Sequence, residues 1–256
     1  MSETPQEIRA RQTETALRIL PSVFENPIRL RGETCDLCTG PLETVGPHCS
    51  QCRAALAAWP GVHVDAVVPL TFAGPRSLQA KQDLRQYKDG GSVEVRSTAA
   101  YRLAHLVWYF AAYHAKCLTA LYGRPDLVAL VPSGKAGARS DGHPLVDLDF
   151  LPRKTPRLQL VRVRDAYPRA VDPGSLRVDG DVEGKRIVLF DDTWTTGASI
   201  QTAAVAVKRA GATHVTAVVI GRWLNGGWSP TDALMSRHDR EPWRPDVCPV
   251  TGGACP

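Results

Sequence analysis

Four short runs of mostly apolar residues set the pattern along the chain. They span Val64 to Leu70, Leu127 to Val131, Ile187 to Phe190 and Val215 to Ile220. Continuous apolar runs that contain β-branched residues are typical of strands buried on both faces of a parallel sheet. Segments with helical spacing lie between them, so the pattern predicts an α/β fold in which a parallel sheet is flanked by helices.

The predicted helices differ in length and in how their ends are marked. Ile200 to Ala210 carries Lys208 and Arg209 in its last turn and stops at Gly211, which are ordinary helix-end signals. Ala99 to Tyr122 is a long, largely apolar helical stretch, and Ala54 to Trp59 predicts a short helix. Residues 1–30 predict a loosely amphipathic helix that ends near Pro21.

The strand ending at Phe190 is followed by the most informative motif of the sequence. Asp191 and Asp192 close the strand, and the loop of Thr195, Thr196, Gly197, Ala198 and Ser199 opens the next helix. In open α/β sheets, ligands bind beyond the carboxyl ends of the strands, and a helix N-terminus offers unpaired N–H groups to an anion. We therefore expect a phosphate-binding loop, with carboxylates that accept hydrogen bonds from sugar hydroxyls or hold hydrated Mg²⁺.

This motif, a hydrophobic strand followed by Asp-Asp-x-x-Thr-Thr-Gly-x-Ser, resembles the signature for 5-phosphoribosyl 1-diphosphate (PRPP) of type I phosphoribosyltransferases. The resemblance implies the type I phosphoribosyltransferase fold. It implies that Asp191 and Asp192 are catalytic residues that bind the ribose hydroxyls, and that residues 195–199 bind the 5′-phosphate. Thr193 and Trp194 depart from the signature, in which these two positions are usually aliphatic. An ordinary βαβ unit with an acidic strand end is the alternative.

Two Cys-x-x-Cys pairs form the second informative feature. Cys35 and Cys38 precede Cys49 and Cys52, with Gly-Pro turns between the pairs. Four thiolates at this spacing can complete a tetrahedral zinc shell without an open position, which predicts a structural metal site; free reduced thiols are the alternative. His48 is a neighbouring candidate ligand, although a histidine in an exposed turn is the simpler interpretation.

The order of these parts resembles the ComF family of phosphoribosyltransferase-like proteins, some of which are associated with DNA uptake. A four-cysteine knuckle is followed by an apolar strand, by a segment with Leu84, Tyr87 and Lys88, and by the PRPP loop. The resemblance covers about Cys35 to Trp223. It implies four regions: a helical leader (1–30), a zinc knuckle (31–60), a phosphoribosyltransferase domain (61–225) and an irregular C-terminal tail (226–256).

The loop after the strand at residues 127–131 is the expected pyrophosphate site. Backbone N–H groups near Ser133 and Gly134, together with the cations Lys135 and Arg139, are suited to a leaving pyrophosphate. ComF proteins usually show Val-Pro-x-Pro and an Arg-Gly-aromatic-Asn-Gln run near this place, and this chain does not. A basic surface turn is the alternative.

Composition and charge narrow the class of protein further. The formal charge is +5 and no apolar run approaches the roughly 20 residues that span a bilayer, so no membrane association is expected. The N-terminus carries no export signal, which favours the cytoplasm, and seven cysteines then indicate metal or free thiols rather than disulfides. The basic charge permits weak nucleic-acid contact. A basic cluster that could line the site, touch nucleic acid or be solvated comprises Arg153, Lys154, Arg157, Arg162, Arg164 and Arg169.

Several other residues receive only simple interpretations. His105 and His114 lie nine positions apart in one predicted helix, so they do not form an i, i+4 metal pair and are expected to be core or surface histidines. Cys117 is expected to be a small buried apolar residue. The spacing of Cys248 and Cys255 in the tail fits neither a tight metal knuckle nor a redox motif.

Two functions remain open from the sequence. The first is a phosphoribosyltransferase that uses PRPP and Mg²⁺, releases pyrophosphate and acts on an unidentified acceptor. The second is a non-catalytic PRPP-sensing or DNA-handling accessory protein. The sequence does not identify the acceptor, and a homo-oligomer is left open.

Overall fold

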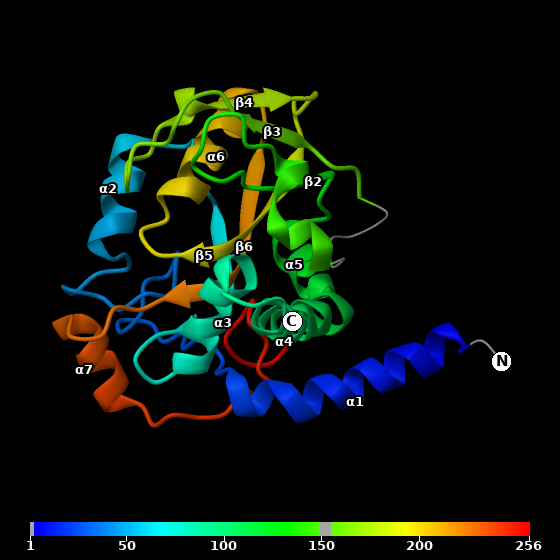
Figure 1. Cartoon of the computed structure of the whole chain (residues 1–256). Helices are drawn as coiled ribbons and strands as arrows, with labels where there is room; N and C mark the ends of the chain where they lie inside the picture. The colour runs from blue at the N-terminus through cyan, green and yellow to red at the C-terminus, as the bar shows by residue number, and fades with distance from the viewer. Residues whose placement is uncertain (1–2, 149–154) are drawn as a thin grey trace.

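The computed structural model describes residues 3–148 and 155–256 (Figure 1). The helices are α1 (Pro5–Val23), α2 (Ser50–Ala58), α3 (Leu78–Asp89), α4 (Val93–Tyr109), α5 (Ala115–Tyr122), α6 (Ala198–Arg209) and α7 (Ser229–Arg237). The strands are β1 (Ala66–Ala73), β2 (Leu127–Leu130), β3 (Gln159–Arg162), β4 (Leu176–Asp179), β5 (Arg186–Trp194) and β6 (His214–Trp223). No helix in this part of the chain is both long and apolar enough to cross a bilayer.

The main sheet is parallel, as the apolar runs predict. Its strand order is β1-β6-β5-β2, and each neighbouring pair is parallel. β3 and β4 form a separate antiparallel pair, and a single bridge between Val128 and Arg157 connects the approach to β3 with the free side of β2. This order places β5 in the interior of the sheet, next to β2 and β6.

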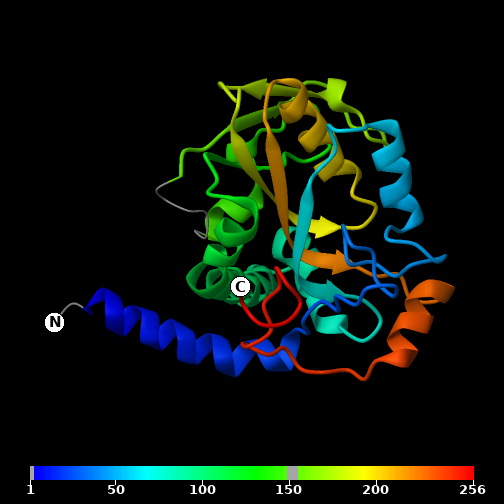
Figure 2. The same cartoon turned by 180° about the vertical axis from the view of Figure 1, so that it is seen from behind.

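Alternate residues of each strand pack on opposite faces of the sheet. On β5, Val188 and Phe190 belong to the core shared with α1, α3, α4 and α5. Ile187 and Leu189 belong to the core shared with α6, the four N-terminal cysteines and the β3–β4 pair. Figures 1 and 2 show the two layers on either side of the sheet. The expected fold class, a parallel sheet flanked by helices with a four-cysteine cluster, is confirmed.

Two predicted boundaries differ from the structure. β5 continues to Trp194 because β6 runs beside it to Trp223, so both aspartates lie inside the last part of the strand. α1 continues through Pro21 to Val23, since Leu20 and Val23 extend the buried stripe of that helix. Tertiary packing overrides the local signal in both cases.

Three features were not expected from the pattern. α3 covers the segment that contains Leu84, Tyr87 and Lys88. The predicted long helix at residues 99–122 is divided by a π-helical turn, Phe110–His114, between α4 and α5. α7 lies within the segment that we expected to be irregular.

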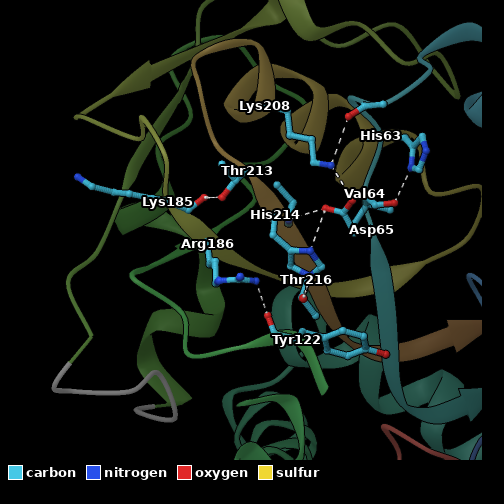
Figure 3. Close-up of polar contacts among 12 residues, drawn as sticks. His63, Val64, Asp65, Tyr122, Lys185, Arg186, Lys208, Thr213, His214 and Thr216 are labelled. Atoms are coloured by element: carbon cyan, nitrogen blue, oxygen red, sulfur yellow. Dashed lines mark hydrogen bonds and ion pairs between the residues drawn. The ribbon is translucent and has the colours of Figure 1, made fainter. Parts of the chain in front are cut away.

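The amino ends of the strands carry a polar network (Figure 3). Asp65, just before β1, forms a 2.6 Å ion pair with Lys208 Nζ and accepts a 2.7 Å hydrogen bond from the Val215 N–H. His214 Nδ1 lies 3.6 Å from the same carboxylate, and its ring stacks on Tyr122. These groups tie the end of α6 to the starts of β1 and β6, so this edge of the sheet has a structural role.

Candidate functional site

The loop between β5 and α6 lies at the carboxyl edge of the sheet. Gly197 is the residue before α6 and has φ +83°, in the left-handed region that favours glycine. The buried Trp194 indole lies against it, and a Cβ at Gly197 would be 2.2 Å from Trp194 Cζ2. Glycine is therefore required here by conformation and by space, and contact with the buried indole fixes the shape of the loop.

The amides at the start of α6 are open. Ala198 N–H makes one long hydrogen bond of 3.4 Å to Thr196 Oγ1. Within the described residues, the N–H groups of Gly197, Ser199 and Ile200 donate to no acceptor, and α6 has no side-chain cap. Thr195 and Ser199 are exposed beside these amides. Open amides at a helix N-terminus, flanked by hydroxyls, form an arrangement that can bind a phosphate.

Asp191 and Asp192 lie just before this loop and differ in environment. Asp192 Oδ2 forms a 2.6 Å ion pair with Lys88 Nζ and accepts a 2.9 Å hydrogen bond from the Tyr87 hydroxyl. Burial raises the pKa of Asp192, but the charge of Lys88 and the hydrogen bonds from Lys88, Asp191 and Tyr87 together hold it below its usual value. Burial, reinforced by the charge of Asp192, raises the pKa of Asp191 well above the ordinary range.

His143 extends from the loop after β2 toward the acidic pair. Its Nε2 lies 3.8 Å from Asp191 Oδ1, and the ring is almost fully buried. Burial, with a smaller contribution from the charge of Lys88, lowers the pKa of His143 to about 4. The imidazole is therefore neutral at pH 7. His143, Asp191 and Asp192 form a group that could hold a cation.

The loop after β2 is more self-contained than the loop after β5. The N–H of Ala136 donates to Asp165 Oδ1 over 2.8 Å, and Arg139 forms an exposed ion pair with Asp141 at 3.1 Å. Ser133, Gly134 and Lys135 are exposed. An anion at this loop would thus meet the backbone near residues 133–135, while Arg139 would have to leave Asp141 or be shared with it.

Arg162 supports the loop after β2 from inside. Its buried guanidinium donates to Ser133 O at 3.2 Å and to Ser175 Oγ at 2.6 Å. The described residues of the predicted basic cluster do not form one patch. Arg162 is buried, whereas Arg164 forms a 2.6 Å ion pair with Asp172. Arg169 is exposed at φ +61°, and Arg157 is exposed beside β2. Arg153 and Lys154 lie outside the described residues.

Two of the cavities lined by predicted site residues include the loop after β2. One, of about 230 Å³, is lined by Gly134 and by Ser199 and includes Arg169 on its wall. The other, of about 460 Å³, is lined by Lys88, Ser133, Arg139 and His143. The loop after β2 contributes to both, so the structure places the predicted 5′-phosphate and pyrophosphate loops around neighbouring cavities. Lys135 lines neither of them.

Comparisons with known proteins give only distant structural likenesses. No family model matches the sequence, and no curated protein is detectably similar to it. A purine phosphoribosyltransferase from Pyrococcus horikoshii Ot3 is 17% identical over 50% of this chain and 89% of that protein, with a TM-score of 0.30. Orotate phosphoribosyltransferase of Mycobacterium tuberculosis H37Rv, solved in complex with PRPP, is 24% identical over 64% and 83% of the two chains, with a TM-score of 0.31.

A phosphoribosyltransferase from Corynebacterium diphtheriae gives a similar result, with 23% identity over 57% of this chain and 93% of that protein and a TM-score of 0.30. All three likenesses are distant, and the functional features of this chain are those of its own residues and geometry.

The four N-terminal cysteines converge as predicted. Cys35, Cys38, Cys49 and Cys52 are buried, and their sulfurs all lie within 4.8 Å of one another. Cys38 Sγ and Cys49 Sγ are 3.7 Å apart. Two sulfurs bound to one zinc ion at about 2.3 Å would be about 3.8 Å apart in tetrahedral geometry, so the cluster fits one ion.

Arg222 connects this cluster with the phosphate loop. From the end of β6 its buried guanidinium donates to Cys38 O at 3.2 Å and to Trp194 O and Thr195 O at 3.1 Å each. A Cβ at Gly40 would be 2.2 Å from Arg222 Nη2, so the knuckle packs directly on this cation. The four-cysteine cluster and the loop thus share one hydrogen-bonded support.

Sequence reasoning missed three residues of the site. His143 and Arg222 carry no local motif, and only the fold brings them to the acidic pair and to the phosphate loop. Tyr87 was named for its place in the sequence without a role. The structure pairs the neighbouring Lys88 with Asp192.

Proposed function

We propose that this chain binds PRPP with Mg²⁺ at the carboxyl edge of its sheet and acts as a phosphoribosyltransferase that releases pyrophosphate. The observation that carries the proposal is the set of open amides at residues 197–200, next to the Asp191–Asp192 pair. A sugar 5-phosphate has an anion for the amides and hydroxyls for the carboxylates. The likeness of residues 187–199 to the PRPP signature supports the same ligand.

Each predicted residue then has a role in binding. Residues 195–199 hold the 5′-phosphate, and Asp191 and Asp192 orient the ribose. Ser133, Gly134, Lys135 and Arg139 receive the pyrophosphate, with Arg169 as an added cation at the cavity of Ser199. Mg²⁺, when bound with PRPP, neutralises pyrophosphate charge, and the acidic pair is the group suited to hold it. The chain's own contribution to the transfer is to orient the ribosyl centre and to stabilise the departing anion.

The proposal extends to the organisation of the chain. We infer a ComF-type arrangement, in which a zinc-bearing knuckle (31–60) supports a phosphoribosyltransferase domain (61–225), with a helical leader (1–30) and a C-terminal segment (226–256) packed against it. The knuckle supports the phosphate loop through Arg222, which donates hydrogen bonds to both of them. A cytoplasmic protein with PRPP and an acceptor as partners is consistent with this arrangement.

A second function, PRPP sensing or DNA handling without catalysis, is favoured by a specific observation. Asp192 already forms an ion pair with Lys88 and a hydrogen bond with Tyr87, and Arg139 forms an ion pair with Asp141. A ligand must share or displace both ion pairs before the ribose and pyrophosphate are fully held. Such a site can bind the phosphate end of PRPP without stabilising the transfer step.

Titration of Mg–PRPP into the protein, combined with an assay of pyrophosphate release over a panel of bases and amines, tests the two functions. We expect micromolar-range binding by the wild type, with release of pyrophosphate for the catalytic function and none for the sensing function. Asp192→Asn is expected to lower any turnover about ten- to a thousandfold, the range for loss of a positioning or electrostatic group.

Asp181→Asn is the matched control. It makes the same change in charge at an exposed carboxylate that pairs with Lys185, just before the amino end of β5. It should leave binding and turnover unchanged. Equal affinity and turnover in wild type and Asp192→Asn would remove Asp192 from the site, and absence of any PRPP binding would contradict both functions.

A further inference from the structure

A second group of metal-binding side chains lies on the helical side of the molecule, away from the candidate site. His114 ends the π-helical turn between α4 and α5, Cys117 lies in α5, and Cys248 and Cys255 come from the C-terminal segment. One ligand atom from each residue lies within 4.8 Å of all the others. Figures 1 and 2 both place the C-terminus beside α4 and α5. Residues more than a hundred positions apart are therefore brought to one point.

We propose that His114, Cys117, Cys248 and Cys255 bind a second structural zinc ion, which fastens the C-terminal segment to the helices. Three sulfurs and one imidazole form an ordinary tetrahedral zinc shell. His114 Nδ1 and Cys255 Sγ are 3.4 Å apart. A nitrogen and a sulfur bound to one zinc ion would be about 3.6 Å apart in tetrahedral geometry, so this spacing fits a shared ion.

The backbone around Cys248 repeats the turn of the first cluster. At Cys35, its N–H donates to Gly40 O at 2.7 Å, and its carbonyl accepts from Thr39 N–H at 2.9 Å. At Cys248, its N–H donates to Gly253 O at 2.7 Å, and its carbonyl accepts from Gly252 N–H at 2.7 Å.

The fifth residue of each turn has positive φ, +58° at Thr39 and +82° at Gly252. The same six-residue turn thus presents the leading cysteine of both clusters. The second cluster differs in the source of its next sulfur, because Thr251 occupies the position that Cys38 holds in the first.

The helix is also shaped for this contact. The π-helical turn Phe110–His114 ends at His114, and Cys117 follows three residues later on the same helical face. Single π-helical turns inside α-helices frequently mark functional sites. His114 is 4% exposed, and the ring nitrogen that faces Cys255 Sγ is Nδ1. A buried imidazole with a ring nitrogen beside sulfurs is suited to a metal ligand.

The surroundings fit a bound ion of this kind. Cys117 and Cys248 are fully buried, and Cys255 closes the cluster from the exposed side. All seven cysteines are free, so the sulfurs are not committed to disulfides. Arg29 holds the turn by donating to Pro249 O at 3.1 Å, and a Cβ at Gly252 would be 2.5 Å from Arg29 Cβ. This cation beside the turn would offset part of the negative charge of three zinc-bound thiolates.

Metal analysis of the full chain, purified under reducing conditions, tests the proposal. We expect two zinc ions per chain in the wild type and one in Cys255→Ser, whose exposed side chain can be changed without disturbing the core. Cys38→Ser, which opens the first cluster, should also keep one ion. The two ions are thereby assigned to separate sites, independently of PRPP binding or activity.

Two histidine variants give a matched pair on the same helix. His114→Gln should lose the second ion, or lose it to a chelator at least tenfold faster than the wild type does. His105→Gln should retain both ions, because His105 is half-buried beside Tyr101, contacts the ring and carbonyl of that residue, and does not belong to the cluster. In Cys255→Ser, amide exchange in residues 239–256 should rise while exchange in α6 stays unchanged.

The proposal is overturned if the wild type holds a single zinc ion that Cys255→Ser retains. It is also overturned if Cys248 and Cys255 are joined in a disulfide in the reduced preparation, or if His114→Gln and His105→Gln hold equal amounts of metal.

Discussion

The two edges of the parallel sheet use polar residues in opposite ways. At the amino edge, Asp65 is held by Lys208, the Val215 N–H and the nearby His214 (Figure 3). At the carboxyl edge, the amides that begin α6 have no acceptor in the described part of the chain, and the Asp191 carboxyl is buried with a raised pKa. One edge satisfies its charges internally, and the other leaves donors open.

This difference separates stability from binding within one sheet. The amino-edge contacts join secondary-structure elements, so their loss should weaken the fold without reaching a ligand. The carboxyl-edge groups are costly to leave unpaired when they are shielded from water, and a ligand that pairs with them recovers that cost. Polar groups left open at the point where α/β proteins bind ligands are therefore the stronger evidence for function.

Gly197→Ala should break the carboxyl edge and gives the largest expected effect. A Cβ at this residue would overlap the Trp194 indole. The alanine backbone would also have to adopt the positive φ of Gly197. We expect affinity for Mg–PRPP to fall about a hundredfold, which corresponds to losing about 3 kcal/mol of amide–phosphate hydrogen bonding. Calorimetric titration measures it.

The control for this variant is Gly227→Ala. Gly227 also has positive φ, +76°, but a Cβ there would meet nothing within 4 Å. Its backbone strain should cost about 1 kcal/mol of stability and leave PRPP affinity unchanged. Equal affinity in Gly197→Ala and Gly227→Ala would contradict the role of the loop.

The buried histidine at the carboxyl edge should make stability depend on pH. The pKa of His143 is lowered to about 4 in the folded chain, against about 6.5 when unfolded. The unfolded chain therefore takes up this proton first, so the contribution is complete above pH 6.5 and declines as pH falls toward 4. Between pH 7 and pH 5 it should decrease by about 2 kcal/mol.

Urea unfolding of wild type and His143→Gln at both pH values isolates this contribution. Asp191 acts in the opposite sense, because its raised pKa makes the folded chain bind a proton more readily as pH falls. The contribution of Asp191 is common to the wild type and His143→Gln. The difference between their changes in unfolding free energy from pH 7 to pH 5 therefore reports His143. A wild type that loses no more stability than His143→Gln would show that the imidazole is not held neutral.

Asp65→Asn tests the amino edge and should have the smallest effect. Asp65 is partly exposed and pairs with a Lys208 side chain that is 6% exposed. We expect a loss of about 1–2 kcal/mol in the free energy of unfolding, with PRPP affinity unchanged. Asp192→Asn should instead lower PRPP affinity, and a PRPP defect in Asp65→Asn would remove the distinction between the edges.

Local patterns were enough to predict most of the fold. The alternation of the four apolar runs predicted the parallel sheet, and both faces are covered as expected. Boundaries were less predictable, because β5 gains its last residues only through pairing with β6. The π-helical turn before α5 has no signal in the apolar periodicity.

The candidate site divides in the same way. Asp191, Asp192 and residues 195–199 form a contiguous motif, and Cys35 to Cys52 form paired local spacings, so both could be predicted from sequence. His143 and Arg222 reach the site only through the fold. The second cysteine cluster combines residues from 114 to 255, and no spacing within the sequence indicates that they meet.

The most direct test of the central proposal follows the backbone amides of residues 197–200 by NMR during titration with ribose 5-phosphate and then with Mg–PRPP. We expect these amides to show the largest shift changes with both ligands, since both carry the 5-phosphate, while amides beside Asp65 do not change. The proposal that this loop binds the sugar phosphate would be contradicted if these amides stayed unchanged at saturating PRPP while amides elsewhere in the chain shifted.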